Sequence, residues 1–155
     1  MIASIPDIQK ILIILEVADK QVLFIILDEE GSINRKGNGS PDCEDNDLFI
    51  GITSENLFNQ IKPFITEEMQ EFWGNKYDLP DKNGRLCCLN ILYKDDKIET
   101  GVQFLYGEFS QGPPNPFRTL VIKAVELTNN WHEQQKRIAF ESIIARKAKP
   151  WWKFW

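Results

Sequence analysis

The sequence lacks the side-chain combinations that mark most enzyme sites. Only one histidine, His132, occurs in 155 residues, which excludes multi-histidine metal sites and leaves one base for any Ser–His or Cys–His pair. Neither a G-x-S-x-G nucleophile elbow nor a G-x-x-x-x-G-K-[ST] phosphate loop is present. His132 follows Trp131, one position off the apolar stripe of a predicted helix, so we expect it to be partly exposed. These absences favour a protein that is not an enzyme, and they predict no cofactor.

Cysteines are also few, and their number is odd. Cys87 and Cys88 are adjacent in a predicted strand, where neighbouring side chains point to opposite faces, so they are poorly placed to bond each other. Cys43 stands alone, and no C-x-x-C spacing occurs. We therefore expect free thiols in a reducing compartment, which favours a cytoplasmic location.

Long hydrophobic runs are missing as well. The longest apolar stretches are residues 11–15 and 22–27, far short of the roughly 20 residues that span a bilayer. No basic residue precedes Lys10, and no small-residue cleavage pattern follows a long apolar stretch. The sequence predicts neither a transmembrane helix nor a secretory signal.

The charges are unevenly distributed along the chain. Its 18 basic and 23 acidic residues give a net charge of −5. Residues 1–131 hold 12 basic and 21 acidic side chains, a net charge of −9, whereas residues 132–155 hold six and two, a net charge of +4. Because phosphate binding requires positive charge, this acidic body disfavours double-stranded nucleic acid as a partner.

Hairpin patterns predict a single α+β domain over residues 1–149, followed by a short tail of residues 150–155. Strands are expected at residues 11–18, 21–27, 32–35, 48–52, 86–93 and 98–109, which gives a mainly antiparallel sheet of five to six strands. Residues 5–18 also fit a helix, because apolar residues recur there at helical spacing, but the run of isoleucines favours a strand.

Two helical segments are expected on one face of this sheet. The first covers residues 55–62, breaks or kinks at Pro63 and restarts over residues 66–74, where Gly74 ends it. Between it and the next strand, residues 75–85 are predicted to be a connector. The second helix begins at the Asn115-Pro116 pair and runs to about residue 145, with a bend near Asn129 as an alternative.

Acidic residues gather between positions 28 and 47, where seven acids accompany two bases. An acidic surface attracts a basic partner and speeds its encounter, so these acids are the predicted partner-binding residues. They are Asp28, Glu29, Glu30, Asp42, Glu44, Asp45 and Asp47. A weaker hypothesis makes Asp42, Glu44 and Asp47 ligands of a hard cation, although their spacing fails the EF-hand pattern.

Residues 151–155 place four aromatic side chains among basic residues. These side chains are Trp151, Trp152, Phe154 and Trp155, and each needs a partner for its apolar surface. The tail could pack on its own domain as a lid, or dock on another protein or on a second copy of the chain. A membrane surface and single-stranded nucleic acid are the less favoured alternatives.

These patterns together favour a non-catalytic protein-binding module. Its most concrete form is an immunity-type inhibitor, which would use an acidic surface to neutralise a basic toxin or nuclease. The alternative is a small hydrolase or transferase whose catalytic carboxylates converge only in the folded chain.

Overall fold

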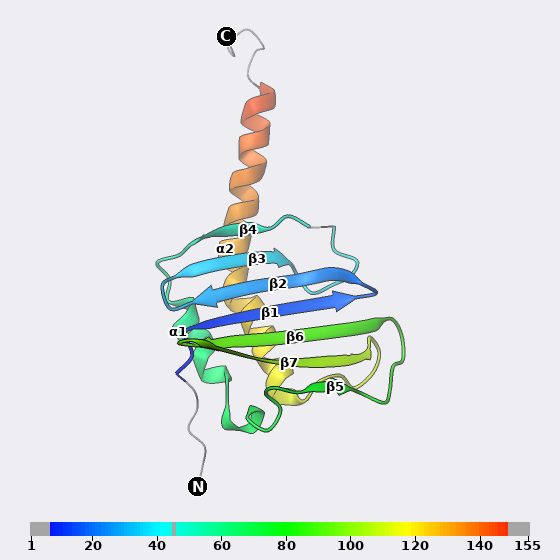
Figure 1. Ribbon diagram of the computed structural model, residues 1–155. Helices are drawn as coiled ribbons and strands as arrows, with labels where there is room; N and C mark the ends of the chain where they lie inside the picture. The colour runs from blue at the N-terminus through cyan, green and yellow to red at the C-terminus, as the bar shows by residue number, and fades with distance from the viewer. Residues whose placement is uncertain (1–6, 45, 149–155) are drawn as a thin grey trace.

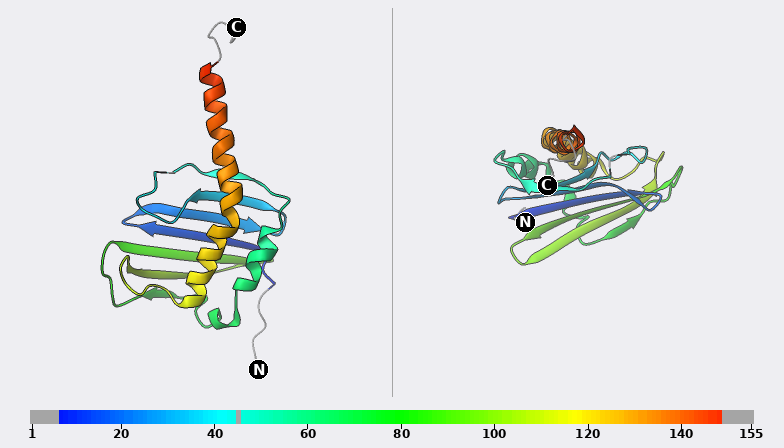
Figure 2. Two further views of the ribbon diagram at one scale, coloured as in Figure 1. Left: turned by 180° about the vertical axis from the view of Figure 1, so that it is seen from behind. Right: turned by 90° about the horizontal axis from the view of Figure 1, so that it is seen from above.

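A computed structural model describes residues 7–44 and 46–148, and it describes side chains as far as residue 145. A seven-stranded sheet carries all the described helices on one of its faces (Figure 1, Figure 2). Across the sheet the strand order is β4-β3-β2-β1-β6-β7-β5. The strands are β1 (Lys10–Val17), β2 (Lys20–Asp28), β3 (Ser32–Gly37), β4 (Phe49–Ile52), β5 (Lys76–Asp78), β6 (Leu86–Asp95) and β7 (Ile98–Gly107).

The helical layer consists of two α-helices and two short 3₁₀ turns. They are α1 (Leu57–Ile61), η1 (Lys62–Phe64), η2 (Glu67–Met69) and α2 (Asn115–Ala148). The predicted α+β class is confirmed, but the sheet has one strand more than expected and is mixed. The missed strand is β5, which pairs in parallel with β7 at the sheet edge. It lies in the segment predicted to be a connector, because three residues are too few to show a periodic pattern.

The segment that fitted both strand and helix is a strand from Lys10 onward. β1 lies in the middle of the sheet, between β2 and β6, and pairs antiparallel with both. Ile11 and Ile13 are completely buried against the helices, as expected for a central strand rich in β-branched residues. The turn to β2 is formed by Ala18 and Asp19, both with positive φ, whereas the predicted strands 11–18 and 21–27 left residues 19 and 20 for it.

The predicted helix over residues 66–74 is wrong. Only one 3₁₀ turn, η2, forms there, and irregular turns follow it. Phe72 instead packs edge-on against Phe117 at 5.5 Å, and Trp73 packs edge-on against Tyr93 at 4.8 Å. Placing both neighbouring aromatic rings in the core offsets the loss of helical hydrogen bonds, so tertiary packing overrides the local signal.

The long C-terminal helix is confirmed and continues three residues beyond its predicted end. α2 contains 34 residues, about 51 Å of helix. Its first half lies on the sheet, where Phe117, Leu120 and Ala124 are completely buried. Among the side chains that the structure describes, His132 is the last buried one, and beyond it the helix projects past the β4 edge of the sheet (Figure 1, Figure 2).

Candidate functional site

An acidic cleft lies between the β2–β3 turn and the connection from β4 to α1. Its volume is about 310 Å³, and residues 27–32 and 53–58 line it. Asp28 shapes the turn, because its Oδ1 accepts hydrogen bonds from the backbone N–H groups of Glu30 and Ser32, at 3.0 and 2.9 Å. The Thr53 N–H donates to the carbonyl oxygen of Gly31 at 2.9 Å, which joins the two walls. Gly31 has a φ of +90°, and a Cβ there would lie 2.8 Å from the Thr53 oxygen, so this position requires glycine.

All the charged side chains that line this acidic cleft are negative. Its lining includes four carboxylates, from Asp28, Glu29, Glu30 and Glu55, and no lysine or arginine. Glu29, Glu30 and Glu55 are exposed. Leu57 and Phe58, which also line it, are buried and supply an apolar floor. Glu55 was not among the predicted partner-binding residues, since it is 25 positions from Glu30 and only the fold brings them together.

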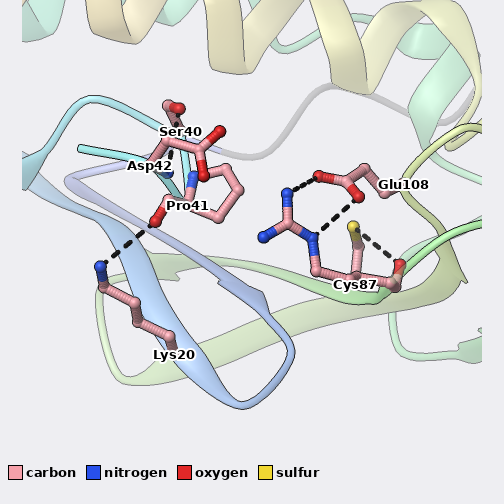
Figure 3. A network of polar contacts seen from close by, with 7 residues as sticks. Lys20, Ser40, Pro41, Asp42, Cys87 and Glu108 are labelled. Carbon is pink, nitrogen blue, oxygen red and sulfur yellow. Dashed lines mark hydrogen bonds and ion pairs between the residues drawn. The ribbon is translucent and has the colours of Figure 1, made fainter.

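The second group of predicted acids lies at the opposite end of β3. Residues 38–44 leave the sheet where β3 ends, whereas the 28–31 turn lies where β3 begins (Figure 1). The Lys20 ammonium group holds this loop by donating to the carbonyl oxygen of Pro41 at 3.3 Å (Figure 3). It also donates to the carbonyl oxygen of Cys43 at 3.4 Å. Asp42, Glu44 and Asp47 are all exposed, and Asp45 lies outside the described residues. The predicted acidic surface is therefore two separate surfaces.

No metal site is visible among the described residues. Nowhere in residues 7–44 and 46–148 do three or more His, Cys, Asp or Glu side chains gather in a way that could hold an ion. Asp42, Glu44 and Asp47 therefore do not converge on a shared point.

Arg85 and Glu108 form an ion pair near Asp42, in the loop that follows β3. The Arg85 guanidinium donates from Nε to Glu108 Oε1 at 2.9 Å and from Nη2 to Oε2 at 2.5 Å. This hydrogen bond lowers the pKa of Glu108 and raises the pKa of Arg85. A general acid needs a raised carboxyl pKa at neutral pH, so Glu108 is shifted in the wrong direction for that role.

Cys87 and Cys88 are not activated as nucleophiles. Cys87 is buried, and its Sγ contacts the Arg85 carbonyl oxygen at 3.7 Å (Figure 3). Burial raises the pKa of both Cys87 and Cys88, which keeps them as thiols at neutral pH. All three cysteines of the chain are free of disulfides.

The prediction that His132 is partly exposed is wrong. The side chain is 2% exposed and packs edge-on against Phe49, with ring centroids 5.7 Å apart. β4 passes over α2 at this point, and its Gly51 lets the Trp131 ring approach so closely that a Cβ would lie 2.9 Å from Cζ2. Sequence periodicity along the helix could not reveal this cover, because it comes from a strand 80 residues away.

A buried arginine was missed by the sequence reasoning. Arg35 on β3 is 1% exposed and donates from Nη1 to Val125 O, Thr128 Oγ1 and Asn129 Oδ1, at 3.2, 2.7 and 3.0 Å. Its Nε donates to Gly37 O at 2.8 Å. Arg35 therefore joins the sheet to α2. The signal was present, because Arg35 shares strand parity with the buried Ile33.

Two further surfaces are apolar. A cavity of about 280 Å³ lies on the helix-bearing side, lined by Leu15, Leu89, Tyr106 and Val121 among others. Burial raises the pKa of the Tyr106 hydroxyl, so that group stays protonated. The opposite face of the sheet carries no described helix (Figure 2). Its side chains alternate with the buried ones and are partly exposed, as with Leu12, Ile14, Phe24 and Ile26.

The predicted aromatic tail lies outside the described residues. Its four aromatic residues are Trp151, Trp152, Phe154 and Trp155. In the described part of the chain, no helix is both long and apolar enough to cross a bilayer. No known protein-family model matches the sequence, and a search of curated proteins finds no significant match.

Proposed function

We propose that the chain is a non-catalytic protein-binding module whose acidic cleft receives basic side chains of a partner protein. The composition of the cleft carries this proposal, because its four carboxylates face no lysine or arginine in its lining. A lysine or arginine of the partner would place its charged group among the carboxylates and its aliphatic stem against Leu57 and Phe58.

The overall charge supports the same partner chemistry. The net charge of −9 over residues 1–131 favours encounter with a basic protein and disfavours nucleic acid. An immunity-type inhibitor is the most specific form of this proposal. A toxin or nuclease that binds nucleic acid has a basic surface, and an acidic protein can cover that surface.

Affinity capture from the native cells at low and high salt tests the proposal. The informative variant is E29K/E30K, which reverses two exposed charges of the cleft. The matched control is E67K/E68K, which reverses an adjacent pair of exposed glutamates elsewhere on the surface. We expect a basic partner that is captured at low salt, lost at high salt, lost with E29K/E30K and kept with E67K/E68K. Equal loss with both variants, or no partner at low salt, would contradict the proposal.

A further inference from the structure

The projecting end of α2, residues 133–148, exposes several large apolar side chains. Four large apolar side chains are exposed within seven residues of it, namely Ile138, Phe140, Ile143 and Ile144. Phe140 is 63% exposed. A helix that extends beyond the body with apolar side chains in water requires a partner for them.

The base of the projecting end lies beside an open sheet edge. β4 pairs only with β3, so one edge of it is unpaired within the described chain. Ile50 and Ile52 on this strand are 70% and 80% exposed, and neither lysine nor proline interrupts it. An unprotected apolar edge of this kind is a template for another strand. Because Trp131 lies against Gly51, a partner that adds to β4 also meets α2.

We propose that a second copy of the chain binds here, with the two β4 strands pairing antiparallel about a twofold axis and each projecting end crossing the other copy. Such an axis is perpendicular to the joined sheet and keeps the helices of both copies on one side. From Trp131 to Ala148 the helix is about 26 Å long, enough to cross roughly five strands of the second copy at their usual spacing. Those strands would be β4, β3, β2, β1 and β6.

The second copy offers a complementary surface at that distance. Its cavity of about 280 Å³ is lined by Leu15 on β1 and Leu89 on β6. The loop of residues 110–113, which borders this cavity, lies on the side of α2 away from α1 (Figure 2). Charge favours this approach over the body as a whole, because residues 133–148 hold four basic and two acidic residues, whereas residues 1–131 have a net charge of −9. The one charged residue that lines the cavity itself is Arg118. A second copy therefore supplies an edge strand, an apolar cavity and the opposite charge together.

Sedimentation equilibrium of the full chain over a range of concentrations tests this proposal. We expect a species of twice the 18.0 kDa chain mass. The variant F140D/I144D places charges on the projecting end, and I50K/I52K places them on the β4 edge. Each should weaken self-association by about tenfold or more. The control I98D changes an exposed isoleucine at the start of β7, a strand outside the five that the helix end would cross, and it should remain dimeric.

Three results would overturn the proposal. The first is a chain that stays monomeric up to about 100 μM. The second is a dimer that survives both F140D/I144D and I50K/I52K but dissociates with Ile14→Asp, which would place the contact on the uncovered sheet face. The third is a monomer that binds phosphatidylglycerol vesicles through Phe140 and Ile144. The variant E29K/E30K should self-associate like the wild type, so the failure of one proposal does not imply the failure of the other.

Discussion

Replacing Arg35 with methionine should destabilise the fold, because the buried guanidinium joins the sheet to α2. The guanidinium donates four hydrogen bonds from β3, three of them to α2. Methionine keeps much of the side-chain volume, so the cost arises from lost bonds rather than from a cavity. The Thr128 hydroxyl keeps its own bond to Ala124 O at 2.7 Å, whereas Gly37 O loses the buried donor that Arg35 provides.

The expected magnitude follows from these bonds. A hydrogen bond to a charged group contributes about 1.5–3 kcal/mol, and the energy gained on removing a buried charge from a low-dielectric site offsets part of the sum. We therefore expect Arg35→Met to lower the free energy of unfolding by about 2–4 kcal/mol. For a chain of this length that corresponds to a Tm roughly 6–12 °C lower.

Urea unfolding followed by circular dichroism measures this change. The control is Lys36→Met, which removes the same charge one residue away, where the side chain points to the other sheet face and is partly exposed. We expect that control to change the stability by less than about 0.5 kcal/mol. If Arg35→Met and Lys36→Met had the same midpoint and the same m-value, Arg35 would not stabilise the packing of α2 on the sheet.

Three further predictions concern other contacts. Gly51→Ala should lower the free energy of unfolding by about 1–3 kcal/mol, because its Cβ would lie 2.9 Å from the Trp131 ring. In thermal unfolding, adding Trp131→Leu should recover part of this loss, and purely additive effects of the two changes would contradict the clash. Because the pKa of Glu108 is lowered, its ion pair with Arg85 stabilises the fold at pH values above the ordinary carboxyl pKa, and this stabilisation is lost as the pH falls through the folded-state pKa. NMR titration should show a higher pKa of Glu108 in Arg85→Gln, and an unchanged pKa would refute this cause. The raised pKa of Cys87 predicts slow alkylation at neutral pH that accelerates in urea, and equal rates in the two conditions would refute it.

Local patterns were sufficient for the largest elements of the fold. Period-two alternation and turn residues located the two long hairpins, and the three- and four-residue spacing after Asn115-Pro116 located α2. Both signals act over neighbouring residues. They failed at residues 66–74, where helix signals were present but Phe72 and Trp73 turn into the core against partners distant in sequence.

The candidate site was less predictable for the same reason. The acids between positions 28 and 47 are neighbours in sequence, yet six residues of β3 separate them by about 20 Å. Glu55 joins the acidic cleft only because Thr53 bonds to Gly31 across two segments. Sequence proximity therefore grouped residues that the strand keeps apart, and it omitted one that the fold adds.

The projection of α2 beyond the sheet has a consequence for how the helix opens. Isolated helices of about 16 residues are marginal in water, but the buried half of α2 already supplies the nucleus that residues 133–148 need. Their amide protons should therefore exchange by fraying, independently of global unfolding, while the amides near Phe117 and Leu120 exchange only with the whole domain. A partner that covers the helix end would then be recorded as slowed exchange over residues 133–148, with little change in the protection of the sheet.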